Sequence, residues 1–109
     1  MTTEAVLQVT TTTDAQEKAE QIARALIDRH LAACVQVSGP ISSFYRWQGK
    51  VEAATEWSCT AKTTQSKYAE VERAIRELHS YDEPEIVATE IVAGSASYLN
   101  WVRNECGKA

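Results

Sequence analysis

The centre of the chain alternates apolar and polar residues over two long stretches that a tight turn separates. We expect residues 33–47 and 50–63 to form the two strands of one long β-hairpin. Gln48-Gly49 marks the turn, because glycine takes the positive φ that two-residue hairpin loops need. In the second strand the odd positions should face the core, since they hold its apolar residues: Val51, Ala53, Trp57, Cys59 and Ala61.

The first strand of this hairpin needs one extra residue to match the second. Its apolar Val35 and Val37 also fall on odd positions, whereas a two-residue turn pairs odd positions with even ones. A β-bulge at Gly39-Pro40 resolves the conflict, because proline donates no ladder hydrogen bond and glycine is tolerated at bulges. The bulge predicts a polar face, where we expect a pocket, formed by Cys34, Gln36, Thr60 and Lys62.

The predicted hairpin is long for a chain of 109 residues. Strands of this length reach roughly 40 Å, whereas a compact chain of this size has a radius of gyration of about 13 Å. The tip should therefore protrude, and it carries Phe44, Tyr45 and Trp47. Because exposed aromatic patches usually mark interfaces, we expect a homo-oligomer.

The rest of the chain predicts an α+β fold. Asp14 is expected to cap the first helix, with Glu17 completing a capping box. The order β-α-β-β-α-β followed by a helix is the ferredoxin-like plan, with two helices on one face of an antiparallel sheet. The other predicted elements are strands at 6–11 and 86–92, and helices at 15–30, 66–79 and 95–106.

Composition restricts the class of protein. The length fits one domain over residues 1–109. No apolar run is long enough to span a membrane, and the N-terminal residues lack the pattern of a signal peptide, so we expect a cytoplasmic protein. The net charge of −4 argues against nucleic-acid binding. The three cysteines have no spacing that indicates disulfides or a zinc site.

Several segments, in this order and spacing, resemble the CutA divalent-cation tolerance proteins: LAACV at 31–35, SFYRWQGK at 43–50, Glu56, Lys62-Thr63, HSY at 79–81, PEI at 84–86, Gly94 and YLNW at 98–101. The resemblance implies a ferredoxin-like homotrimer, akin to the PII signalling proteins, in which the sheets face inward and the hairpins reach neighbouring subunits. It also implies a role in tolerance of divalent cations, chiefly copper. Thr10 stands where some members have a cysteine that binds copper, so that ligand is missing here.

His79 is the strongest candidate for a metal ligand, because imidazole suits copper and zinc. Glu85 lies in the loop that follows it, as do Asp82 and Glu83. Either three-fold symmetry or Cys34 of a neighbouring subunit would complete a shared site. The alternative is that His79 ends its helix, where a cation interacts favourably with the helix dipole, while the acidic residues are solvated.

A second group of residues predicts a cleft for a small ligand. A lysine, a glutamate and aromatic walls suit a small anionic or zwitterionic molecule, and the resemblance implies that these positions meet between subunits. The alternative is an ion pair with aromatic packing at the interface. The residues of this predicted cleft are Tyr45, Trp47, Glu56, Lys62, Tyr81 and Trp101.

Nothing in the sequence predicts an enzyme. There is no phosphate-binding glycine loop, no zinc-protease motif and no CxxC. Cys34 would be a reactive thiolate only if Lys62 lowered its pKa. We therefore expect a binding protein, with a trimer that anchors other proteins as a further alternative.

Overall fold

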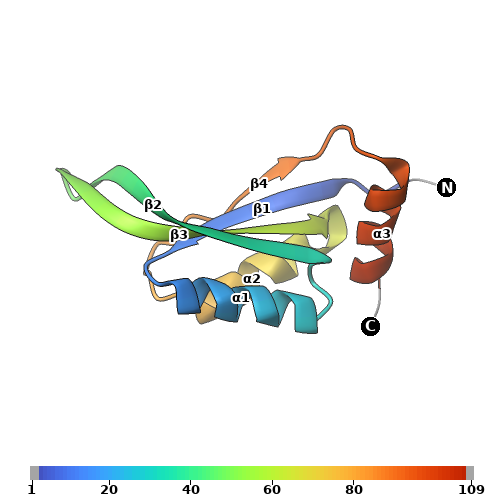
Figure 1. Ribbon diagram of the computed structural model, residues 1–109, viewed down its shortest axis with the longest axis horizontal. Coiled ribbons are helices and arrows are strands. Elements are labelled where there is room, and N and C mark those ends of the chain that lie inside the picture. Colours follow the sequence, from blue (N-terminus) through green and yellow to red (C-terminus); the bar gives the residue numbers. More distant parts are fainter. Residues whose placement is uncertain (1–2, 108–109) are drawn as a thin grey trace.

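The computed structural model describes residues 3–107, which form one four-stranded antiparallel sheet with helices (Figure 1). The strand order is β2-β3-β1-β4, so the predicted ferredoxin-like α+β plan with an extra C-terminal helix is confirmed. The strands are β1 (Val6–Thr13), β2 (Cys34–Trp47), β3 (Lys50–Thr64) and β4 (Val87–Glu90). The helices are α1 (Gln16–Asp28), the short 3₁₀ helix η1 (Gln65–Lys67), α2 (Tyr68–Leu78) and α3 (Ala96–Cys106).

The β2–β3 hairpin extends well beyond the helices (Figure 1). The described chain measures 50 × 26 × 22 Å because of this projection. Gln48 and Gly49 have φ values of 51° and 81°, the left-handed pair that two-residue hairpin turns require. The predicted hairpin, turn and protruding tip are therefore confirmed.

The predicted bulge in β2 is also confirmed. Ser38 pairs with Ser58 and Ile41 with Glu56, so Gly39 and Pro40 together form the irregularity. A Cβ atom at Gly39 would lie 2.6 Å from Cδ1 of Trp57. Glycine is therefore needed here because the indole ring packs directly against the backbone.

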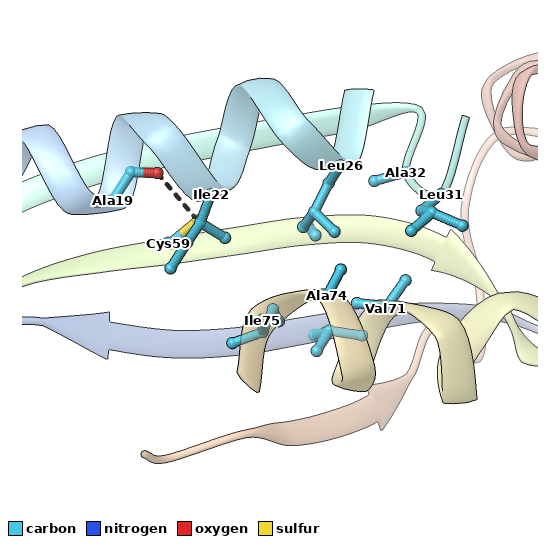
Figure 2. Packing of buried hydrophobic residues seen from close by; sticks show 11 residues of the cluster. Ala19, Ile22, Leu26, Leu31, Ala32, Cys59, Val71, Ala74 and Ile75 are labelled. Atoms are coloured by element: carbon cyan, nitrogen blue, oxygen red, sulfur yellow. Dashed lines mark hydrogen bonds between the residues drawn. The ribbon is translucent and has the colours of Figure 1, made fainter. Parts of the chain in front are cut away.

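The core lies between the sheet and the pair α1 and α2 (Figure 2). The Cys59 thiol points towards α1, where it donates a weak hydrogen bond to the Ala19 carbonyl at 3.8 Å. The odd positions of β3 face this core at Cys59 and Ala61, as predicted. The prediction was wrong for Val51, which is 67% exposed, and for Ala53, which is also exposed, because both lie in the part of the hairpin that extends beyond the helices.

The opposite face of the sheet is covered by a helix at one end only. There α3 packs on the sheet end away from the hairpin tip, with Val102 and Cys106 against Val6 (Figure 1). The predicted polar face exists on this side, since Cys34 pairs with Lys62 and residue 36 pairs with residue 60. Of its even-numbered β3 positions, Lys50 and Glu52 near the tip are exposed, whereas Glu56 and Thr64 are buried.

Two local predictions were wrong. Ala15, not Asp14, occupies the N-cap of α1, and no side chain caps that helix. The Asp14 carboxylate instead accepts a hydrogen bond from the Ser80 hydroxyl at 3.2 Å. The fourth strand is shorter than residues 86–92, because β4 pairs with β1 only over Val87–Glu90.

Candidate functional site

A pocket of about 750 Å³ lies between the hairpin and the loop 79–86 that joins α2 to β4. The hairpin supplies aromatic side chains and Glu56, the loop supplies Tyr81 and carboxylates, and β1 supplies Thr12. The lining residues are Thr12, Ser43, Phe44, Tyr45, Trp47, Glu56, Ser80, Tyr81, Asp82, Glu83, Pro84 and Glu85.

Glu56 and Tyr81, which both line this pocket, are joined by a hydrogen bond. Glu56 is only 6% exposed, although it lies on the sheet face opposite α1 and α2, because the loop folds over it. The Tyr81 hydroxyl donates to Oε2 of Glu56 at 2.7 Å. Burial, and then this contact with Glu56, raise the pKa of Tyr81. The phenol of Tyr81 therefore stays protonated and donates a hydrogen bond to the Glu56 carboxylate.

His79 holds the loop from the other side. Nε2 lies 2.8 Å from the Thr12 carbonyl oxygen, and Nδ1 accepts from the Tyr81 backbone N–H at 3.1 Å. Because a carbonyl only accepts and a backbone N–H only donates, these contacts place a hydrogen on Nε2 and leave Nδ1 as the acceptor. Both ring nitrogens are thus in use, and His79 binds a metal only if one of these hydrogen bonds breaks.

His79 also ends its helix, as the alternative interpretation predicted. It is the C-cap residue of α2, and its backbone N–H bonds to the Ile75 carbonyl at 2.9 Å. The ring lies 4.9 Å from the Tyr81 ring, between centroids. Through these contacts His79 connects the end of α2 to β1 and to the loop.

The pocket is acidic. Glu56, Asp82, Glu83 and Glu85 line it, and no lysine, arginine or histidine is among its described lining residues. Asp82, Glu83 and Glu85 are exposed at the rim. This lining favours a positively charged ligand, whereas the sequence suggested a small anionic or zwitterionic one.

Four of the six predicted cleft residues meet in this pocket: Tyr45, Trp47, Glu56 and Tyr81. Lys62 does not line it, and its Nζ donates to Oε1 of Gln36 at 2.9 Å on the polar face of the hairpin base. Trp101 does not line it either, because it lies on α3, where its ring pairs with Tyr98 at 5.7 Å between centroids.

The three predicted metal ligands do not come together within one chain. Glu85 lies at the pocket rim, whereas Cys34 begins β2 opposite Lys62. Burial, and then Cys34 nearby, raise the pKa of Tyr98, so the Cys34 thiol lies beside α3. Among residues 3–107, no group of three histidine, cysteine, aspartate or glutamate side chains is close enough to hold a metal ion.

Sequence reasoning missed the contributions of Thr12 and Ser43 to the pocket. The predicted first strand ended at residue 11, whereas β1 continues to Thr13 and brings the Thr12 carbonyl to the loop. The run of threonines at 10–13 was the available signal, because threonine favours extended backbone.

The fold and sequence together identify the family. The family model for the CutA1 divalent ion tolerance protein matches residues 7–105, so this chain belongs to the CutA1 family. The divalent-cation tolerance protein CutA of Archaeoglobus fulgidus is 45% identical over 86 residues, which cover 79% of this chain and 83% of that protein. The protein of the same name from Thermus thermophilus is 40% identical over 96 residues, covering 88% of this chain and 93% of its own length.

Solved structures agree with this assignment. CutA from Xylella fastidiosa superposes with a TM-score of 0.90 at 34% identity and covers 93% of this chain and 97% of its own. The A. fulgidus protein, described as periplasmic, gives a TM-score of 0.89 at 40% identity and covers 93% of this chain and 98% of its own. None of these relatives is named for an enzyme activity. Within residues 3–107, no helix has the length and apolar character that crossing a membrane requires.

Proposed function

We propose that this protein contributes to divalent-cation tolerance as a homotrimer that binds copper or another divalent ion at sites shared between subunits. The observation that carries the proposal is the family match over residues 7–105. The sheet face without α1 and α2 supports assembly, because a long, partly apolar sheet face is usually covered. The exposed tip residues Phe44 (74%), Tyr45 (45%) and Trp47 (49%) support it as well.

Shared sites follow from the distribution of donor atoms. The described chain has no three-residue metal group of its own, while Cys34 is partly exposed and Glu85 is exposed. A thiolate, a carboxylate and an imidazole together suit copper or zinc. We propose that Cys34 of one subunit and Glu85 of another supply ligands, and that His79 joins them when its bond to the Tyr81 N–H opens.

A copper titration by calorimetry tests these assignments. Cys34→Ser and Glu85→Gln should each weaken copper binding at least tenfold. The two histidines provide a matched pair, so His79→Ala should weaken binding and His30→Ala should not. Unchanged affinity in Cys34→Ser, Glu85→Gln and His79→Ala together would show that the assigned site is wrong.

We expect the compartment to be the cytoplasm. All three cysteines are free in the described chain, which supports a reducing compartment. Cell fractionation, with the protein detected by an antibody, tests this location. Recovery of the protein outside the cytoplasmic fraction would contradict the expectation.

The pocket favours a second candidate function, a PII-like module that senses a small ligand. Its size falls within the usual range for small-molecule sites, roughly 300–1,000 Å³, and it gathers Tyr45, Trp47, Glu56 and Tyr81. A thermal-shift screen of small charged compounds tests this candidate. Compounds that raise the melting temperature of the wild type but not of Glu56→Gln support it, and a blank screen counts against it.

A further inference from the structure

The walls of the pocket are suited to a cation with an apolar body. Phe44, Tyr45 and Trp47 from β2 and Tyr81 from the loop all line it. Aromatic faces attract ammonium groups through their quadrupoles, by about 0.5–2 kcal/mol per contact. They also supply contact area for the apolar part of a ligand.

The pocket contains a buried carboxyl group that has no cationic partner among the described residues. Glu56 is 6% exposed, and none of the ion pairs between described residues involves it. A buried carboxylate is costly unless hydrogen bonds or a cation compensate it. The Tyr81 hydroxyl compensates Oε2, which leaves Oε1 as an acceptor for a ligand.

Within one chain, the size of the pocket and the arrangement of its donors favour an organic cation over a metal ion. The pocket volume of about 750 Å³ exceeds that of a bare ion many times over. Its carboxylates, moreover, do not belong to any metal-binding group of three among residues 3–107. Divalent ions need several oxygen ligands at about 2.0–2.6 Å, whereas an ammonium group needs one or two acceptors and an aromatic face.

We infer that this pocket binds a small organic cation, an amine whose ammonium group bonds to Glu56 and whose apolar body packs against Tyr45 and Trp47. The inference rests on the small-ligand function proposed above and names the chemical class of its ligand. Asp82, Glu83 and Glu85 at the rim attract the cation as it enters, and this attraction weakens at high salt.

Three probes with one aromatic body and different charges test the inference. Phenethylamine, 2-phenylethanol and phenylacetate are titrated into the purified protein at pH 7 by calorimetry. Phenethylamine should bind at least tenfold more tightly than 2-phenylethanol, and phenylacetate should bind most weakly. Glu56→Gln should weaken the binding of phenethylamine at least tenfold. Glu70→Gln, at an exposed position on α2, should leave the affinity for phenethylamine unchanged.

Two further variants keep the test decisive if Glu56→Gln does not fold. Trp47→Ala at the hairpin tip and Glu85→Gln at the rim should each weaken the binding of phenethylamine about threefold or more. If phenylacetate binds most tightly, the cation assignment is overturned while the small-ligand function stands. If none of the three probes binds the wild type at millimolar concentration, both are overturned, and the copper titration still tests the metal proposal separately.

Discussion

The Tyr81 hydroxyl lies 2.7 Å from Oε2 of Glu56 and ties the loop after α2 to the middle of β3. This contact helps to explain why a glutamate on the sheet face opposite α1 and α2 is almost completely buried. It also closes one side of the pocket, because the same loop carries the acidic rim.

Removing that hydroxyl should destabilise the protein. Tyr81→Phe leaves the buried Glu56 carboxylate without its donor, which should lower the free energy of unfolding by about 1–3 kcal/mol. Urea unfolding measures the change. Tyr68→Phe is the matched control, because the Tyr68 hydroxyl also bonds to a glutamate, Glu72, at 2.9 Å, and Glu72 keeps its ion pair with Arg76. An equal loss in both variants would contradict the special role of the buried pair.

His79 should control the order of the loop. His79→Ala removes the acceptor of the Tyr81 N–H and the donor to the Thr12 carbonyl. Without copper, we expect the Tyr81 amide to exchange its hydrogen at least tenfold faster in this variant, as measured by NMR. The same amide should keep its wild-type rate in His30→Ala, and unchanged exchange in His79→Ala would show that the ring does not hold the loop.

Gly39 should tolerate substitution less well than Gly49. Gly39→Ala places a Cβ atom against the Trp57 ring, and such overpacking should cost about 1–3 kcal/mol. Gly49 also has a positive φ, but a Cβ atom added there would meet nothing within 4 Å. Gly49→Ala should therefore cost only the backbone strain, about 1 kcal/mol. The reverse order in thermal or urea unfolding would show that the bulge is placed incorrectly.

Stability should fall at alkaline pH through the buried thiol of Cys59. Burial raises the pKa of Cys59 from 9.0 to about 11, so the folded chain keeps a proton that the unfolded chain loses. The free energy of unfolding should therefore decrease as the pH rises from 9 to about 11, by up to about 1.4 kcal/mol per pH unit from this group. Cys59→Ala should flatten the profile in this window, and an unchanged slope would contradict the assignment.

The alternation of the central residues predicted the two strands and the need for a bulge, because both follow from the period of two along a strand. Residue type then placed the turn at Gln48-Gly49 and the bulge at Gly39-Pro40. The pocket was only partly predictable. Lys62 and Glu56 share a sheet face, as even positions of one strand must, but they lie six residues apart and only Glu56 is covered by the loop.

The remaining misses have a common physical reason. The position of the loop depends on His79 and Tyr81 meeting residues far away in the sequence, at Thr12 and Glu56. Likewise Asp14 bonds to Ser80 instead of capping α1. Side-chain contacts over such sequence separations leave no local periodicity, so they become visible only in the folded structure.

Native mass spectrometry tests most directly whether a homotrimer of this chain holds divalent metal at shared sites. The purified protein is measured with and without a few equivalents of copper. We predict a species of three times the 12.1 kDa chain mass that takes up copper in discrete steps. A monomer, or a trimer that takes up no copper, would contradict the proposed shared sites.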